Sequence, residues 1–380
     1  MKLGLGLSLS SMQRRRDTPF TPAALFAASE PGVWLDPDDP ATLFSDTAGT
    51  TQAQIGDPVA LVLDKSKGLE LGAELVDLSS WNLPSGAAIV DNKLVWDGVS
   101  IGAQSFDNIS GGGAYLFTFT IESVTNTTVT PLLHNGNAVG AGRSSAGTYT
   151  ELLIGSAGTS RISLRSAGDG IAVISGISVK RLPGNHATQP TLSSRPILRE
   201  SNGLRYLEFD GVDDSLVTPT ITPGTDKVQV FAGVRKFSLD QQTILELSPS
   251  RNSNNGSFDL RATDTEYNGL ARGDASAAGG QIARVDSDAS PSTNVLTCLH
   301  DIAGNLSVLR NSGVSGSPAT GDKGAGNFLA YPVFIGSRSG STLFFEGRIY
   351  SLTVRFGPNL DDPTIERTEH YIAKRTGVSL

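Results

Sequence analysis

Two carboxylates in one short stretch have the spacing that glycoside hydrolysis needs. Glu208 and Asp210 lie two residues apart in an apolar stretch, so on a β-strand they point to the same face. A retaining glycosidase uses two carboxyl groups about 5–5.5 Å apart as nucleophile and acid. Gly211 and the pair Asp213-Asp214 instead indicate a hairpin turn that ends the strand before a third acid can align. We therefore favour a structural turn without catalysis and keep a glycoside hydrolase as the alternative.

Two acidic turns could also offer ligands to a metal ion. The turns at 36–39 and 210–214 are rich in Asp, and Ca²⁺ takes oxygen ligands of this kind. Neither turn has EF-hand spacing, and capping or Asx-turn hydrogen bonds explain both without a metal. The four histidines are scattered, with no Cys or His partner at metal-binding spacing. We expect no cofactor, with a structural calcium ion as the alternative.

Sugar recognition would combine apolar or aromatic surfaces with a few planar polar groups. Trp81 stands between two polar residues near an expected loop, so we expect an exposed ring there. Tyr149 is the second candidate for carbohydrate binding. Trp96 and Tyr115 are flanked by alternating apolar residues and are predicted to lie in the core.

The composition indicates a turn-rich globular β protein. The chain has 380 residues, of which 38% are hydrophobic, 18% are charged and 43 are glycine. A net charge of −8 with no broad basic patch argues against nucleic-acid binding. No apolar run reaches the ~20 residues of a membrane-spanning helix. Cys298 is the only cysteine, so we expect a buried apolar side chain, no intrachain disulfide and folding in a reducing cytoplasm.

Alternating apolar residues predict short strands along most of the chain. Within 69–182 the clearest run is Tyr115–Ile121. Further strands are expected at Val228–Val234, Ser257–Arg261, Asn305–Leu309 and Arg348–Phe356. In the last of these, Tyr350, Leu352, Val354 and Phe356 are expected to share one face.

Two helix starts stand out against this background. Asp39 followed by Pro40 has the pattern of a cap and a first helical residue. The last helix is capped by Asp361 or Asp362, begins with Pro363 and ends at Gly377.

Several short phrases resemble a known family when they are read in order. They are Trp34–Asp39, Asp64-Lys65-Ser66, Gly184–Gln189, Arg195-Pro196 and Tyr206–Leu216. Concanavalin-like (laminin-G-like) domains of many phage and bacterial surface proteins carry similar phrases in the same order. In such domains the second and third phrases form one continuous passage, whereas here more than a hundred residues separate them. The resemblance therefore implies a concanavalin-like β-sandwich with a domain inserted at a loop tip.

The inserted segment, about 69–182, resembles a carbohydrate-binding-module-like jelly roll. The resemblance rests on Glu74-Leu75-Val76 with Trp81, on Gly147–Glu151 and on the closing Ile177-Ser178-Val179. The expected fold is all-β: a discontinuous concanavalin-like sandwich, an inserted jelly-roll sandwich and a short C-terminal helix.

The expected domain boundaries follow from these two resemblances. They are an N-terminal attachment segment at 1–19, the first part of the concanavalin-like sandwich at 20–68, the insert at 69–182 and the second part with the helix at 183–380.

The combination with an N-terminal Leu/Gly segment looks like fibre, spike or tail proteins of tailed phages and gene transfer agents. It implies a structural and adhesive virion protein, made in the bacterial cytoplasm, that binds a bacterial surface polysaccharide. The partners implied are other virion proteins through the N-terminal segment and further copies of the chain, with no nucleic acid and no membrane insertion. Two alternatives stay open, a glycan depolymerase that uses Glu208 and Asp210, and a capsid decoration protein that binds no sugar.

Residues 1–19 are predicted to attach the chain to its particle and to be dispensable for folding. Leu3, Leu5, Leu7 and Leu9 alternate with small residues, a pattern that can add a strand to a partner or pack into its groove. Deletion of residues 1–18 should leave the melting temperature unchanged and abolish incorporation into particles. The checks are calorimetry and an immunoblot of purified particles. Normal incorporation of the shortened chain would contradict the attachment role.

Overall fold

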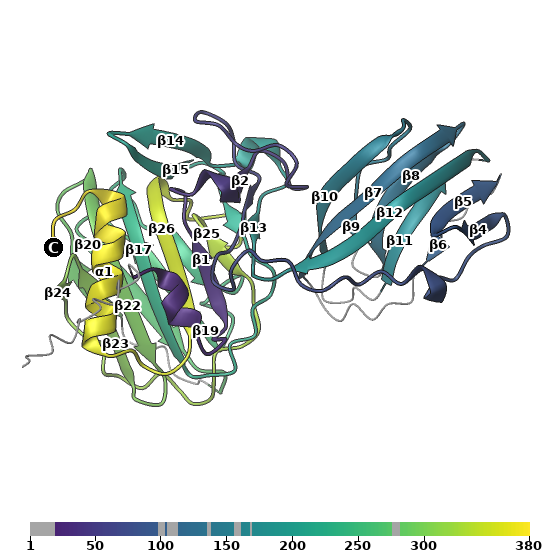
Figure 1. The fold of residues 1–380 in the computed structure, drawn as a ribbon. Helices are drawn as coiled ribbons and strands as arrows, with labels where there is room; N and C mark the ends of the chain where they lie inside the picture. Colours follow the sequence, from purple (N-terminus) through teal and green to yellow (C-terminus); the bar gives the residue numbers. More distant parts are fainter. Residues whose placement is uncertain are drawn as a thin grey trace, which may run out of the picture.

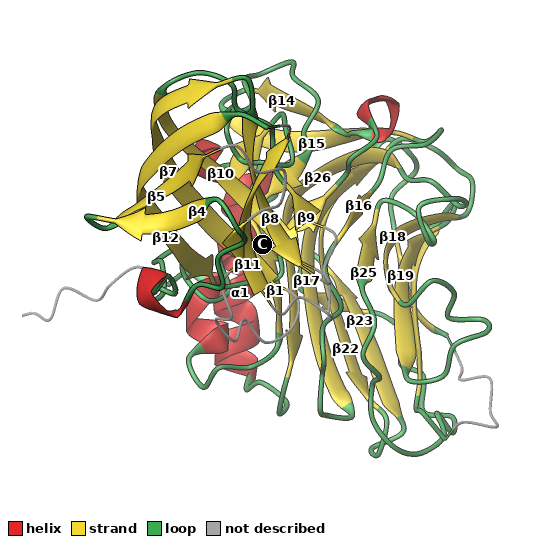
Figure 2. Cartoon of the chain, turned by 90° about the vertical axis from the view of Figure 1, so that its right-hand side faces the viewer, coloured by secondary structure: helices red, strands yellow, loops and turns green. Residues whose placement is uncertain are grey.

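The computed structural model describes residues 20–97, 103–104, 113–134, 138–155, 161–167, 169–275 and 282–380. The N-terminal segment 1–19 lies outside this range. Strands make up nearly all of the described elements, and Figure 1 shows them in a larger and a smaller lobe. The prediction of an all-β protein with a short C-terminal helix is confirmed (Figure 2).

The larger lobe, here called the body, contains two sheets among the described residues. Its eight-stranded sheet contains, in order, β14 (Ile197–Ser201), β15 (Leu204–Asp210), β26 (Glu346–Phe356), β17 (Lys227–Lys236), β22 (Ser292–Asp301), β23 (Leu306–Asn311) and β24 (Val314–Ser315), with β1 (Gly32–Leu35) also pairing with β26. Its nine-stranded sheet contains β2 (Leu43–Phe44), β3 (Leu61–Val62), β13 (Ala187–Thr188), β16 (Leu216–Val217), β25 (Val333–Ile335), β18 (Gln242–Leu247), β19 (Ser257–Ala262), β20 (Glu266–Arg272) and β21 (Ala283–Asp286).

The smaller lobe, here called the insert, has a five-stranded and a four-stranded sheet in the described part of the chain. The first contains β10 (Gly147–Gly155), β7 (Gly113–Thr125), β12 (Ile171–Leu182), β5 (Lys93–Asp97) and β4 (Ala87–Val90). The second contains β6 (Ala103–Gln104), β11 (Arg161–Ala167), β8 (Thr128–His134) and β9 (Ala138–Val139). Each lobe has its own cluster of buried apolar side chains.

The helices cover loops and one sheet face. The described 3₁₀-helices are η1 (Pro22–Phe26), η2 (Pro40–Thr42), η3 (Leu78–Ser80) and η4 (Leu192–Ser194), and the α-helix is α1 (Asp362–Thr376). Asp361 caps α1 by accepting a hydrogen bond from the Thr364 amide at 3.0 Å, and Gly377 ends it with φ +73°. Asp39 caps η2, so the helix predicted after it exists only as one 3₁₀ turn. None of these helices is long and apolar enough to cross a bilayer.

The predicted face of the longest late strand is only partly correct. Leu352, Val354 and Phe356 lie in the body core as expected, but Ile349 takes the next core position in place of Tyr350. The reason is a β-bulge: the pairing of β26 with β17 shifts register between Gly233 and Val234, which skips Tyr350. The Tyr350 ring instead contacts the Tyr206 ring, with centroids 5.1 Å apart.

A small apolar cluster joins the two lobes. Leu61 and Leu63 of the body pack with Leu152 and Leu182 of the insert, and all four are buried. The Leu152 amide also donates a hydrogen bond to the Ala48 carbonyl at 2.7 Å. The contact between lobes is therefore apolar at its centre, with a backbone hydrogen bond beside it.

We predict that the insert folds separately from the body. Replacing residues 69–182 with a short Gly/Ser linker should leave a soluble body that unfolds cooperatively. Its free energy of unfolding should fall by about 2–5 kcal/mol, because Leu61 and Leu63 lose their cover and burial of one leucine contributes about 1.5–3 kcal/mol. Urea titration of this variant and of the isolated insert provides the measurement. An aggregated body together with an unfolded insert would show that the two lobes need each other to fold.

Candidate functional site

The two halves of the interrupted motif, Asp64-Lys65-Ser66 and Gly184–Gln189, meet at the buried carboxylate of Asp64. Asp64 Oδ1 accepts hydrogen bonds from the amides of Trp34 and Ser66, both at 2.8 Å. Its Oδ2 accepts from the amide of Asn185 at 2.7 Å and from the Ser66 hydroxyl at 2.8 Å. The Asp64 amide in turn donates to His186 Nδ1 at 2.9 Å. The chain thus leaves the body for the insert and returns to it at the same point.

The electrostatics of this joint suit a structural role. Burial raises the pKa of the Asp64 carboxyl in spite of its four donors. Burial also lowers the pKa of His186 to about 4, which agrees with a neutral ring whose Nδ1 accepts the hydrogen bond from the Asp64 amide. All the polar atoms of the Asp64 carboxylate have partners within the joint, so they are not available to a ligand.

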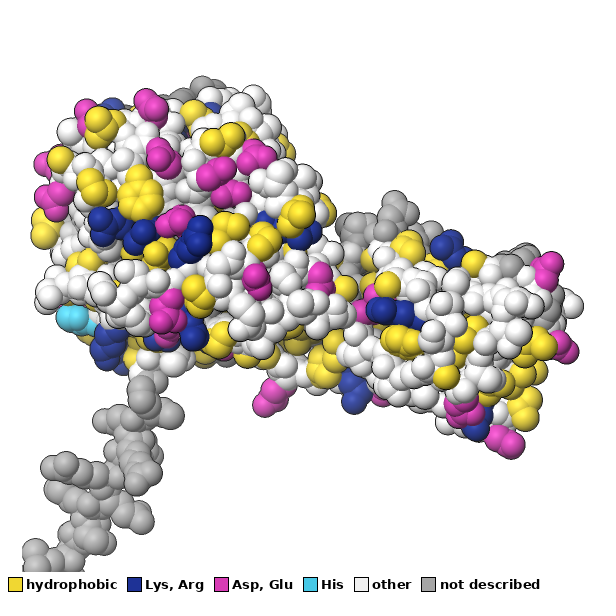
Figure 3. All heavy atoms as spheres, turned by 90° about the horizontal axis from the view of Figure 1, so that it is seen from above, with side chains coloured by type: hydrophobic (Ala, Val, Ile, Leu, Met, Phe, Trp, Pro, Cys, Tyr) yellow, Lys and Arg dark blue, Asp and Glu magenta, His cyan; other side chains and the backbone are white. Residues whose placement is uncertain are grey.

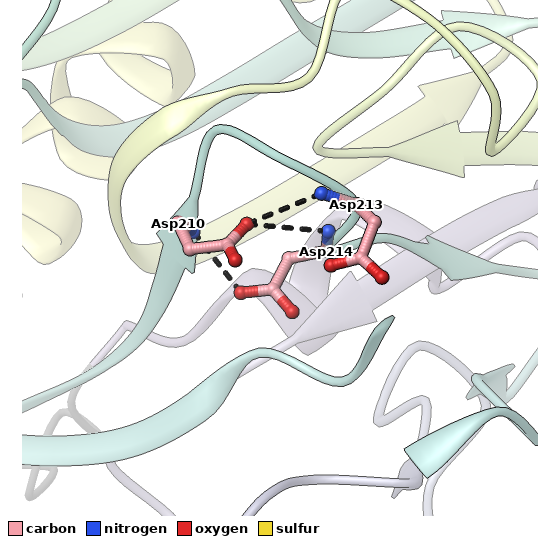
Figure 4. Close-up of side chains that lie close together, drawn as sticks. All are labelled: Asp210, Asp213 and Asp214. Atoms are coloured by element: carbon pink, nitrogen blue, oxygen red, sulfur yellow. Dashed lines mark hydrogen bonds between the residues drawn. The ribbon is translucent and has the colours of Figure 1, made fainter. Parts of the chain in front are cut away.

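The candidate catalytic stretch ends in a tight turn, as expected from its sequence. Asp210 Oδ1 accepts a hydrogen bond from the amide of Val212 at 2.8 Å. It also accepts one from the amide of Asp213 at 3.3 Å, which is drawn in Figure 4. The Asp210 amide donates to Asp214 Oδ2 at 3.0 Å. These bonds use the Asp210 carboxylate to close the turn after β15.

Glu208, the other candidate, is held by two arginines. Its Oε1 lies 3.3 Å from Arg199 Nε and its Oε2 lies 3.2 Å from Arg348 Nε. Glu208 and Asp210 both line a cleft of about 340 Å³ that Phe237 and Glu346 also line. The strand therefore brings the two carboxylates to one cleft, each with partners of its own.

The acidic turn also brings together the one group of carboxylates that could hold a metal ion in the described residues. Ligand oxygens of Asp210, Asp213 and Asp214 all lie within 4.8 Å of one another. Asp214 is only 4% exposed. Burial, followed by the negative charge of Asp210, raises the pKa of the Asp214 carboxyl to about 7. Near neutral pH the cluster can be neutralised either by a proton on Asp214 or by a cation such as Ca²⁺.

The other acidic turn, 36–39, already has protein cations. The Asp36 carboxylate lies 3.2 Å from Lys65 Nζ and 3.4 Å from an Arg375 nitrogen. Lys65 Nζ also lies 2.7 Å from the Asp39 carboxylate, and Arg375 lies 2.6 Å from that of Asp38. These ion pairs engage one carboxylate oxygen of each of the three aspartates with a protein cation.

The exposure expected for Trp81 is wrong. Its side chain is 7% exposed and belongs to the apolar core of the insert. Asp77 caps η3 by accepting a hydrogen bond from the Ser79 amide, and Trp81 follows as the last residue of that turn. The local turn directs the ring inward although its sequence neighbours are polar, so it offers no platform for a sugar. Trp96 and Tyr115, each 2% exposed, lie in the core as predicted, and so does Cys298.

Tyr149 is half-buried, and its ring already has protein partners. The Phe119 ring lies with its centroid 5.7 Å away, and the Arg143 guanidinium lies over the Tyr149 ring at 4.8 Å. The Tyr149 hydroxyl donates a hydrogen bond to the Ser145 carbonyl at 2.9 Å. These contacts leave little of the ring for stacking.

A buried ionic network in the body was missed by the sequence analysis. Asp259 Oδ2 lies 2.7 Å from Arg251 Nε and 3.1 Å from Arg261 Nε, while Arg338 Nε lies 2.8 Å from Glu246 Oε2. The sequence does contain a pattern that indicates buried charges, because charged residues alternate with core residues in β18 and β19. The pairing itself depends on loops that are distant in sequence.

Comparisons with known proteins give only distant likenesses in structure. No family model and no curated protein matches the chain. A CBM40 domain of the Ruminococcus gnavus IT-sialidase, determined with α2,3-sialyllactose, is 18% identical over 38% of this chain and 84% of that one, with a TM-score of 0.30. Botulinum neurotoxin type C, whose cell entry depends on two ganglioside molecules, is 10% identical over 47% of this chain and 45% of that one, with a TM-score of 0.36. The NanB sialidase of Streptococcus pneumoniae is 14% identical over 41% of this chain and 24% of that one, at 0.30. Likenesses of this size do not extend to function.

Replacement of Asp214 by asparagine should stabilise the protein at alkaline pH when no divalent cation is present. The folded-state pKa of Asp214, about 7, lies above the ordinary value of 3.8, so its contribution to stability is largest below about pH 4 and is lost as pH rises toward 7. Asp214→Asn removes the repulsion between the carboxylates of Asp210 and Asp214. The asparagine side chain keeps an oxygen that can accept the hydrogen bond from the Asp210 amide. The gain expected in EDTA at pH 8 is about 1–3 kcal/mol, and it should vanish near pH 4.

Thermal unfolding in EDTA at both pH values measures this effect, with the exposed Asp240→Asn as control. If the cluster holds calcium, added Ca²⁺ should raise the melting temperature of the unchanged protein and not that of Asp214→Asn. A less stable Asp214→Asn at pH 8 in EDTA would contradict the repulsion between these carboxylates.

Proposed function

We propose that the protein is an adhesive component of a phage-like particle, a fibre, spike or tail protein that binds a glycan on the bacterial surface. The observation that carries the proposal is the arrangement of the lobes. The insert projects from one side of the body, and α1 covers the opposite side (Figure 1). The first described residue, Phe20, lies beside α1, with the Arg367 guanidinium over its ring at 5.6 Å. An attachment segment at 1–19 would thus leave the insert pointing away from the particle.

The contacts between the two lobes favour an insert that is held in a fixed position, pointing away from the particle. The hydrogen bonds that Asp64 accepts hold together the two chain segments that connect the body to the insert. The apolar cluster that contains Leu61 and Leu152 also joins the two lobes. Figure 3 shows the insert as a narrower lobe beyond a waist, with acidic and basic side chains interspersed on the visible face. A mixed surface with a net charge of −8 suits contact with a sugar better than contact with nucleic acid.

The depolymerase alternative would depend on Glu208 and Asp210. A retaining pair needs one carboxylate free to attack and one that holds a proton. Both Glu208 oxygens have arginine partners, and the Asp210 carboxylate closes a turn. These contacts favour binding without hydrolysis.

Purified protein should adsorb to host cells and release no reducing sugar from them. Glu208→Gln should adsorb as well as the unchanged protein, because the residue forms surface ion pairs of small energetic value. Glu200→Gln, which removes a similar ion pair with Arg205 on the neighbouring strand, is the matched control. Sugar release that disappears only in Glu208→Gln would establish the depolymerase. Absence of adsorption by the unchanged protein would favour the decoration protein.

A further inference from the structure

A cleft of about 490 Å³ lies where the body meets the insert. The body contributes Thr47, Ala48, Thr188 and Pro190, and the insert contributes β9 with the residues after it and the end of β10. Its volume falls in the range of about 300–1,000 Å³ that is typical of small-ligand sites. The cleft belongs to neither lobe alone.

One wall of the cleft is an unpaired strand edge. The strand β10 is the outermost of its sheet, with β7 on one side only. The Leu152 amide points away from β7, since it donates to the Ala48 carbonyl at 2.7 Å. By the alternation of a strand, the backbone groups of Ile154 point the same way. Since the Leu152 amide is bonded to Ala48, the backbone groups of Ile154 are the ones on this wall that can face the hydroxyl groups of a ligand.

The side chains of the cleft have the mixed character of a sugar site. Val139 is 56% exposed and, with Pro190, offers apolar surface to the C–H faces of a ring. Thr47 and Thr188 place hydroxyl groups among these apolar residues. A pyranose has this combination of C–H faces and hydroxyl edges.

A buried carboxyl group lies beneath the cleft. Glu151 is 1% exposed and lines the cleft; its Oε2 accepts a hydrogen bond from the Ala141 amide at 3.0 Å. Its Oε1 has no hydrogen-bond partner among the described residues, and the nearest cation, Arg143, is 3.9 Å away. Burial raises the pKa of the Glu151 carboxyl, and the negative charge of the Asp46 carboxylate, nearby in the body, raises it further. The other arginine nearby, Arg195, donates to the carbonyls of Ser45, Gln189 and Pro190. A ligand carboxylate at this end of the cleft would therefore face the unpartnered Glu151 oxygen, which disfavours an acidic sugar.

The residues from Ala138 to Ala141 hold this carboxyl in place. A Cβ at Gly140 would lie 2.7 Å from Glu151 Oε2 and 2.7 Å from Pro131 Cγ. Only glycine lets the chain pass so close, and the Ala141 amide reaches Glu151 because of it. The position of the Glu151 carboxyl is therefore a fixed feature of the cleft wall.

We propose that this junction cleft is the glycan-binding site and that it takes a neutral or amine-bearing sugar residue in preference to an acidic one. The inference rests on the glycan-binding function proposed above and adds the site and the class of sugar. It places recognition at the contact between lobes and not on Trp81 or Tyr149.

Val139→Arg provides the direct test. Val139 is exposed, so an arginine there fills the cleft mouth without disturbing a core, and Val90→Arg, at a residue 50% exposed in another part of the insert, is the matched control. Binding is measured on purified host polysaccharide and on an array that carries neutral, amino and uronic-acid oligosaccharides. Val139→Arg should weaken binding by about tenfold or more, whereas Val90→Arg should match the unchanged protein.

Glu151→Gln tests the class of sugar with the same array. The glutamine side chain keeps an oxygen that accepts the hydrogen bond from the Ala141 amide, but it cannot carry a negative charge. The binding of uronic-acid oligosaccharides relative to neutral ones should therefore be stronger for Glu151→Gln than for the unchanged protein. Equal binding by Val139→Arg and Val90→Arg would overturn the site while leaving the proposed function intact. A preference of the unchanged protein for acidic sugars would overturn the class, and no binding at all would overturn both the site and the proposed function.

Discussion

Asp64 fixes how the two lobes meet, because its buried carboxylate accepts hydrogen bonds from both edges of the opening through which the chain leaves the body. A hydrogen bond to a charged group contributes about 1.5–3 kcal/mol, yet the raised pKa of the Asp64 carboxyl shows that its burial opposes ionisation more strongly than the four donors favour it. The amide of Asn185 closes the opening from the far side, 121 residues along the chain. The path of the insert, its contact with the body and the cleft between them all depend on this joint.

Much of this architecture could be predicted because its signals are local. The phrase around Asp64 and that around His186 read as one interrupted passage, and the structure brings them within 2.9 Å of each other. The caps of α1 depend only on Asp361 and Gly377, and each acts within a few residues of its own position. The acidic turn after β15 could be predicted for the same reason, since the Asp210 side chain bonds to amides two and three residues further along.

The failures have a common physical origin, which is contact between residues distant in sequence. The bulge at Tyr350 depends on how β26 pairs with β17, and strict alternation cannot reveal it. The burial of Trp81 depends on strands of the insert that follow it in the chain. The candidate site could be predicted least of all. It combines Ala48, Glu151 and Thr188, and nothing in the sequence around each of them indicates that they face one cleft.

If both lobes contact the ligand, ligand binding and the contacts between the lobes stabilise each other. In the proposed site, a sugar would contact the body through Thr47 and Thr188 and the insert through Val139 and the β10 edge. Its binding free energy therefore adds to the apolar cluster and to the Asp64 bonds that hold the lobes together. The same joint keeps the two walls at a fixed spacing before the ligand arrives, which reduces the entropy lost on binding. In the proposed arrangement, the insertion of one sandwich into a loop of the other would create the binding surface as well as the shape that presents it.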